Sequence, residues 1–264
     1  MLGAIIGDII GSRYEFHNIK SKNFELFTDA NCFTDDTILT CATAEWLLSD
    51  KKPEEILKKW GTLYKERTYE NGKIGAFGSG FTNWLETGKP YRAKTNGCVM
   101  RLSPIPLMVD DLEIALNKAV ELTSITHNHK ESILATRVYI ETMYMAKKGI
   151  DVPVIKNYIT HKYGYDLSKS VDEIRPSYNK FYTSCKNSVP QAIICALDAN
   201  SYEDAIRNAV SLGGDSDTLA CMAGGIAEVR FGVPNDIKKQ AIVYMDNRVL
   251  NIVNRFYEKI NSID

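Results

Sequence analysis

Residues 212–234 read LGGDSDTLACMAGGIAEVRFGVP, and this stretch decides the fold class. Two glycines and a pair of aspartates come first, and an apolar sequence with helical spacing follows them. The pattern predicts a helix over residues 217–231. Apolar residues recur at the same spacing along nearly the whole chain, and alternating apolar and polar runs bounded by turns are hard to find. The sequence therefore predicts an all-α fold.

Helical spacing extends outward from this stretch. Further helices are predicted over residues 35–49, 53–66, 111–124, 130–148, 153–162, 188–199, 202–211 and 236–260. The apolar N-terminal segment MLGAIIGDIIGSRYEF predicts the first core helix, although Asp8 interrupts it. Residues 163–187 have the weakest pattern, so we expect a long surface loop there, of a kind that often carries function. No linker, low-complexity tract or internal repeat divides the chain, which indicates one domain over residues 1–264.

The composition excludes several classes of protein. Lys and Arg number 32 against 33 Asp and Glu, so the net charge of -1 gives no reason to expect general nucleic-acid binding or an anionic membrane as partner. No apolar run reaches the length of about 18 residues that a transmembrane helix needs. The N-terminus lacks the basic region of a signal peptide, and we expect a cytoplasmic protein. The six cysteines form no CxxC pair, which favours buried free thiols over a zinc site.

Two short segments, FTDDT at residues 33–37 and GGDSDT at residues 213–218, concentrate carboxylates and hydroxyls at predicted helix starts. Helix capping is the simplest interpretation of each segment alone. Capping needs only one oxygen, however, and each segment supplies two carboxylates and a hydroxyl. If the fold brings the segments together, four carboxylates need cations to offset their repulsion, and oxygen ligands favour two ions such as Mg²⁺, Mn²⁺ or Ca²⁺. Gly213 and Gly214 admit a sharp turn with positive φ.

Nearly the whole chain resembles the ADP-ribosylglycohydrolase family. The resemblance rests on these two segments together with GAIIGDIIGSRYE at 3–15, NGCVMRLSPI at 96–105, THNHKE at 126–131 and SVPQAI at 188–193. It implies a compact orthogonal bundle of helices, with two Mg²⁺ or Mn²⁺ ions at the bottom of a cleft. By motif position, the implied metal ligands are Thr34, Asp35, Asp36, Asp215, Asp217 and Thr218.

The resemblance also implies substrate contacts. Glu15 matches a glutamate at the metal site that moves on substrate binding, although an isolated glutamate is ordinarily a surface acid. Gly97 and Cys98 match a turn whose backbone amides contact phosphates or ribose, and here Cys98 and Val99 replace the family's usual small residues. His127 is a further candidate contact, against capping or packing as the alternative. Gly78, Ser79 and Gly80, in the FGSG segment, match a flexible substrate loop.

The activity that the resemblance implies is hydrolysis of the glycosidic bond between ADP-ribose and an acceptor. The substrate is then an ADP-ribosylated protein or another ADP-ribose conjugate, and Asp35 or Glu15 is the catalytic base. Two alternatives stay open: a catalytically silent protein that binds ADP-ribose or metal, and a helical metal-dependent phosphohydrolase, which usually adds His ligands. The acceptor stays open too. Four aromatic residues are candidates for stacking on adenine or lining the acceptor entrance, with packing between helices as the alternative: Phe77, Phe81, Tyr178 and Tyr182.

Overall fold

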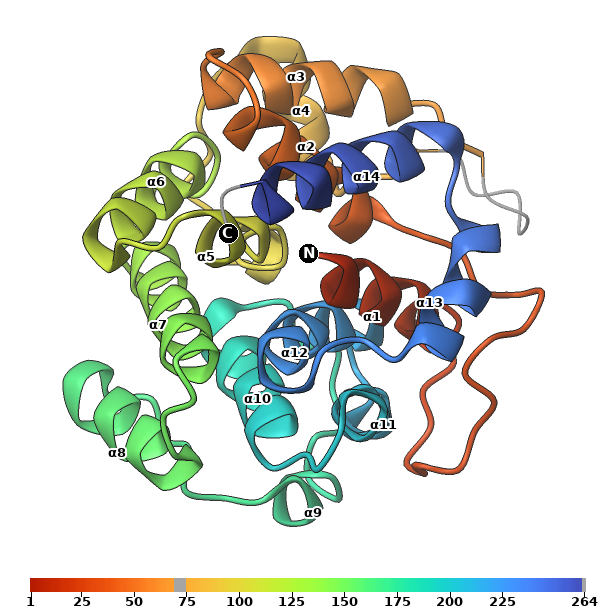
Figure 1. Cartoon of the computed structure of the whole chain (residues 1–264), viewed down its shortest axis with the longest axis vertical. Helices are drawn as coiled ribbons and strands as arrows, with labels where there is room; N and C mark the ends of the chain where they lie inside the picture. Colours follow the sequence, from red (N-terminus) through yellow and green to blue (C-terminus); the bar gives the residue numbers. More distant parts are fainter. Residues whose placement is uncertain (69–74, 263–264) are drawn as a thin grey trace.

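The computed structural model describes residues 1–68 and 75–262, and within them every regular element is a helix (Figure 1). Only isolated β-bridges accompany the helices in this part of the chain. The all-α prediction is confirmed. The elements are α1 (Leu2–Ser12), α2 (Asp35–Leu47), α3 (Pro53–Tyr64), α4 (Ser79–Thr87), η1 (Asn96–Cys98), α5 (Pro104–Met108), α6 (Leu112–Ser124), α7 (Lys130–Lys147), α8 (Val152–Tyr163), α9 (Val171–Ile174), α10 (Cys185–Leu197), α11 (Tyr202–Leu212), α12 (Ser216–Phe231), α13 (Asn235–Ala241), η2 (Ile242–Tyr244) and α14 (Asn247–Asn261).

Helices α1 and α12 form the centre of the molecule and pack antiparallel, backbone against backbone. The glycines of α1 recur every four residues and face α12. A Cβ atom at Gly7 would lie 2.1 Å from the carbonyl oxygen of Ala220, and one at Gly3 would lie 2.5 Å from that of Gly224. No side chain fits between the two helices at these points. The close approach brings Asp8, which follows Gly7, to the N-terminal end of α12.

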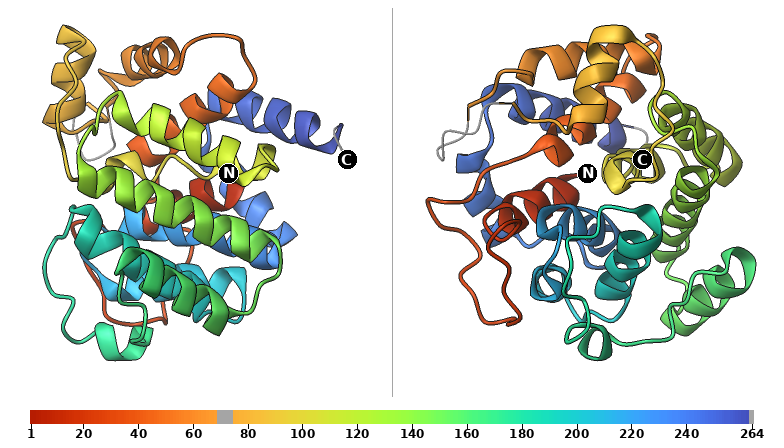
Figure 2. Two further views of the ribbon diagram at one scale, coloured as in Figure 1. Left: turned by 90° about the vertical axis from the view of Figure 1, so that its left-hand side faces the viewer. Right: turned by 180° about the vertical axis from the view of Figure 1, so that it is seen from behind.

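The other helices surround this central pair (Figures 1 and 2). Helices α10 and α11 pack on one side of α12, while α2, with α3 and α14 behind it, covers the other side of the pair. Helix α7 contacts α10 and α12 and carries α6 and α8 on its outside. Helix α1 is buried from Gly3 to Gly11, whereas α14 buries only a stripe of apolar residues. The central helices therefore place any polar group they carry in the interior.

The predicted helices are present, but the prediction of one continuous helix over residues 236–260 was wrong. Residues 236–260 form three pieces, because the backbone becomes extended at Met245 and Asp246 caps a new helix. The carboxylate of Asp246 accepts hydrogen bonds from the amides of Arg248 and Val249, both at 2.9 Å. Residues 163–187 are largely irregular, as predicted, although a capping box at Ser170 begins the short helix α9 within them. Helix α10 begins three residues before its predicted start, and the short helices α4 and α5 were not predicted.

The cysteines are free thiols, five of them buried and Cys32 half-buried. This arrangement agrees with the packing role expected for them. Within residues 1–68 and 75–262, none of the helices combines the length and the apolar content that crossing a membrane requires.

Candidate functional site

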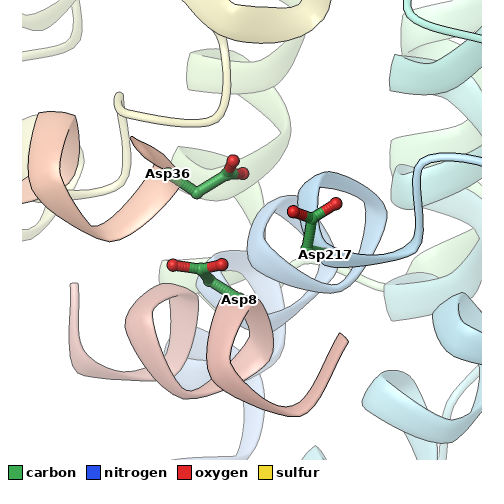
Figure 3. Close-up of side chains that lie close together, drawn as sticks. All are labelled: Asp8, Asp36 and Asp217. Carbon is green, nitrogen blue, oxygen red and sulfur yellow. The ribbon is translucent and has the colours of Figure 1, made fainter. Parts of the chain in front are cut away.

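Three aspartates from three helices meet in the interior of the protein. Asp8 comes from α1, Asp36 from the first turn of α2 and Asp217 from the first turn of α12 (Figure 3). One carboxylate oxygen of each lies within 4.8 Å of the others. Their exposed fractions are 0%, 1% and 3%. Such burial is rare for carboxylates, which ordinarily need a partner of opposite charge when they leave water.

Asp8 connects α1 to the start of α2. Its carboxylate accepts hydrogen bonds from the amides of Thr34, at 2.9 Å, and Thr37, at 3.0 Å, and from the hydroxyls of both residues. Both oxygens of Asp8 are therefore engaged by the polypeptide itself. From the sequence alone, Asp8 stood out only as an interruption of an apolar segment. The sequence did contain a signal for Asp8. It lies in a helix whose glycines recur every four residues, and such a helix packs closely against another and buries the side chains beside the contact.

A second group of carboxylates shares Asp217 with the first. Oxygens of Glu15, Asp215 and Asp217 lie within 4.8 Å of one another. The side-chain amide of Asn96, in the η1 turn, donates to Asp215 at 2.6 Å, and the hydroxyl of Thr218 donates to Asp36 at 3.2 Å. The structure therefore unites the two acidic segments in one site.

Capping accounts for little of this arrangement. The hydroxyl of Thr34 accepts from the amide of Asp36 at a long 3.4 Å, and it lies 2.7 Å from the carboxylate of Asp8, to which it donates. Asp215 occupies the N-cap position of α12, but its side chain makes no capping hydrogen bond. Positive φ angles at Gly213 and Gly214, +73° and +72°, form the predicted turn before it. The carboxylates of Asp36 and Asp215 thus serve something other than helix capping.

The electrostatics of the site disfavour its own charges. Burial raises the pKa of Asp36 and of Asp217 well above the usual value, and the neighbouring carboxylates raise both further. Burial also raises the pKa of Asp8 and of Asp215. Within the part of the chain that the structure describes, none of these four aspartates forms an ion pair with Lys, Arg or His. The N-termini of α2 and α12 offset only part of the negative charge.

Asp36 carries the clearest sign of an external ligand. Among residues 1–68 and 75–262, its buried Oδ1 atom has no hydrogen-bond partner, a condition that proteins ordinarily avoid. The donor atoms around it are oxygens from carboxylates and hydroxyls, a set that suits hard divalent cations such as Mg²⁺, Mn²⁺ or Ca²⁺. The residues present therefore fit the metal that the sequence predicts.

A cleft of about 990 Å³ opens beside the buried aspartates and is lined in part by Thr34, Asp35 and Glu15. Asp35 is half-buried in its wall, whereas the other five predicted ligands lie buried around the cluster. Those five are Thr34, Asp36, Asp215, Asp217 and Thr218. The wall of this cleft therefore carries carboxylates, from Glu15, Asp29 and Asp35.

The predicted substrate turn lies next to the cluster but presents different groups from those expected. The side chain of Cys98 is fully buried and donates to the carbonyl of Thr95 at 3.3 Å, so only its backbone can face a ligand. His127 is 2% exposed, with Nε2 at 2.9 Å from the hydroxyl of Thr95. Burial, followed by Arg101, lowers the pKa of His127 to about 3. A neutral His127 thus braces the turn that contains Gly97.

The FGSG segment is joined to this turn through Tyr91. Gly78, Ser79 and Gly80 form the start of α4, and a Cβ atom at Gly80 would lie 2.9 Å from the Tyr91 ring. That ring lies 5.1 Å from the ring of His127.

The four candidate aromatic residues form two packed pairs. Phe77 packs on Phe81 with ring centroids 4.8 Å apart, and Tyr178 packs on Tyr182 with centroids 5.0 Å apart. Phe81 and Tyr178 are buried, which favours packing for these two, while Phe77 and Tyr182 are half-buried. Tyr178 and Tyr182 line a separate cavity of about 510 Å³.

Comparison with known proteins gives consistent matches. The profile of the ADP-ribosylglycohydrolase family matches residues 1–262. The ADP-ribosylarginine hydrolase Tri1 of Pseudomonas putida (strain GB-1) is 24% identical over 88% of this chain and 70% of its own length. The ADP-ribosylhydrolase ARH3 of Homo sapiens is 23% identical over 98% of this chain and 93% of its own. A solved structure described as an ADP-ribosylglycohydrolase-related protein complex shares the fold, with a TM-score of 0.68, 20% identity and coverage of 98% of this chain and 97% of that one.

Proposed function

Because this chain belongs to the ADP-ribosylglycohydrolase family, we propose that it hydrolyses the glycosidic bond between ADP-ribose and an acceptor. The observation that carries the proposal is the buried group of four aspartates, Asp8, Asp36, Asp215 and Asp217, next to an open cleft. Such a group is costly to the fold unless it binds cations. Membership of the ADP-ribosylglycohydrolase family indicates the reaction that those cations would serve, which is hydrolysis of a glycosidic bond of ADP-ribose.

The site is suited to two divalent ions, Mg²⁺ or Mn²⁺. The proposed ligands are Thr34, Asp35, Asp36, Asp215, Asp217 and Thr218. Asp8 has a different role, because both of its oxygens already accept hydrogen bonds. The Thr34 hydroxyl donates its hydrogen bond to Asp8. Its oxygen lone pairs therefore point away from Asp8, which orients Thr34 as a cation ligand.

When bound, the cations supply Lewis acidity that polarises the ribose hydroxyls beside the bond that breaks. The chain's own groups do the rest. Glu15 and Asp35 both line the cleft, where either carboxylate can accept a proton from the attacking water. The aspartates stabilise positive charge that develops on the sugar in an oxocarbenium-like transition state. The backbone of Gly97 and Cys98 faces the phosphates or ribose, with the FGSG loop as a second contact, and neutral His127 holds the turn in place.

For the acceptor we propose arginine on an ADP-ribosylated protein, ahead of other ADP-ribose conjugates. The wall of the cleft carries three carboxylates that can pair with a guanidinium group, from Glu15, Asp29 and Asp35, and it also carries the guanidinium groups of Arg13 and Arg67. The Pseudomonas relative is named for hydrolysis of ADP-ribosylarginine.

The test is release of free ADP-ribose from arginine-linked, serine-linked and nucleic-acid-linked substrates, with Mg²⁺ and with chelator in parallel. We expect release from the arginine-linked substrate that requires Mg²⁺. Asp217→Asn should abolish release, while Asp236→Asn, on the exposed surface of α13, should not. Full activity in excess chelator would disprove the metal mechanism, and ADP-ribose binding without turnover of any substrate would identify a catalytically silent protein.

A further inference from the structure

The segment after α1 carries Glu15, and a single asparagine ties it to the turn before α12. The Nδ2 atom of Asn18 donates to the carbonyls of Tyr14 at 2.6 Å, Glu15 at 3.0 Å and Gly214 at 3.0 Å. Its Oδ1 atom accepts from the amide of Gly214 at 2.7 Å. The Asn18 side chain therefore bonds the backbone of Glu15 on one side and both backbone groups of Gly214 on the other.

The turn is shaped to receive this side chain. A Cβ atom at Gly213 would lie 3.2 Å from both Cβ and Oδ1 of Asn18. The positive φ of Gly214 is a conformation that side chains rarely adopt. An amide is the group that both donates to and accepts from Gly214, whereas an ionised carboxylate only accepts. The match is thus specific in chemistry as well as in size.

Holding Glu15 here opposes electrostatic repulsion. Its carboxylate lies within 4.8 Å of the carboxylates of Asp215 and Asp217, and its charge is the largest Coulombic cause of the raised pKa of Asp217. Lys20 anchors the same segment to the same turn, because its ammonium donates to the carbonyls of Leu212 and Tyr178. Asn18 differs from Lys20 in that it also bonds the backbone carbonyl of Glu15 itself.

We propose that Asn18 is a positioning residue that holds Glu15 beside the cation bound by Asp215 and Asp217. The inference rests on the proposed function for the presence of cations. The proposal treats the two ions differently. The ion near Glu15 depends on Asn18, whereas the ion near Asp36 is held by residues at the starts of α2 and α12 and does not.

The experiment is a titration of the purified, metal-free protein with Mn²⁺ alone, followed by calorimetry and by the electron paramagnetic resonance signal of free Mn²⁺. Asn18→Ala is expected to weaken one of two binding steps by about tenfold or more, as the loss of several hydrogen bonds to one side chain predicts, and to leave the other unchanged. Asn23→Ala is the matched control, because Asn23 lies exposed in the same segment. Two unchanged steps in Asn18→Ala, or equal weakening of both, would overturn the proposal.

Two further variants distinguish positioning from other effects. Asn18→Asp keeps an acceptor for the amide of Gly214 but adds negative charge near the cations. A purely electrostatic role predicts tighter Mn²⁺ binding, and positioning predicts weaker binding, with Asn23→Asp as the control for charge. In a Glu15→Gln background, Asn18→Ala is expected to add no further loss, since the two residues act as one unit. Additive losses would contradict the role.

The proposal and the proposed function can fail separately. Two Mn²⁺ steps with the expected pattern, in a protein that releases no ADP-ribose, would support the role of Asn18 and refute the activity. A wild-type protein that binds no Mn²⁺ would overturn both. Far-ultraviolet circular dichroism of each variant confirms that the helices are intact.

Discussion

Replacing Gly7 by alanine tests whether contact between the backbones of α1 and α12 builds the site. An alanine Cβ at this position would lie 2.1 Å from the carbonyl oxygen of Ala220 and 2.6 Å from its carbon. Real Cβ atoms essentially never approach other atoms within 3.0 Å. The obstructing atoms belong to a helix backbone and cannot rotate away, so the two helices must separate by roughly 1 Å at this point.

The expected loss of stability follows from two opposing effects. Overpacking of a tight interior costs about 3 kcal/mol, and alanine returns about 1 kcal/mol because it favours the helix more than glycine does. The net loss of about 2 kcal/mol should lower the melting temperature by about 4–8 °C in a protein of this size. The relative loss of cation affinity should be larger than the relative loss of stability. Metal–ligand distances tolerate only about 0.2 Å, and the displacement would move Asp8 and the Thr34 hydroxyl that it orients away from Asp217.

The assay is thermal unfolding of the metal-free protein followed by a Mn²⁺ titration. Gly78→Ala is the control for stability, since a Cβ atom there meets no atom of the described residues within 4 Å and the effect should stay within about 0.5 kcal/mol. Gly7→Ala with the melting temperature and Mn²⁺ affinity of the wild type would refute the reasoning, because the helices would then have room between them.

Three further predictions concern charge. Asp36→Asn should make the metal-free protein more stable, by removing a buried charge that Asp8 and Asp215 repel, and should abolish the rise in melting temperature on adding Mg²⁺; a less stable metal-free variant would contradict this. Because the pKa of Asp36 and of Asp217 is raised in the folded state, folding takes up protons, so the free energy of unfolding of the metal-free protein should rise as the pH falls from the raised values toward the ordinary 3.8. The stabilisation by Mg²⁺ should decrease as the pH falls over the same range. Thermal unfolding across the pH range, with and without Mg²⁺, measures both trends. With its pKa lowered to about 3, His127 should contribute no inflection to kcat/KM between pH 5 and 8, and His127→Asn should change the size of kcat/KM but not the shape of its pH profile.

Local features of this protein could be predicted from its sequence. Helical spacing placed most of the helices, and the clustering of acids in FTDDT and GGDSDT identified Asp36, Asp215 and Asp217, which the structure brings together. The glycine pair before Asp215 predicted the turn with positive φ that the structure contains. Asp246 was not recognised as the N-cap of a new helix. The apolar residues keep their helical spacing on both sides of it, so the sequence pattern does not show whether the helix continues or a new one begins.

By itself, the sequence determined that the protein is helical and that two of its helices begin with acids. Only the tertiary structure decided that these helix starts meet, that Asp8 lies beneath them, and that Asn18 and Asn96 hold the surrounding segments against them. The reason is physical. Helical spacing follows from contacts between residues three or four apart, whereas the site depends on how closely α1 approaches α12, a distance set by side chains that are absent from both helices.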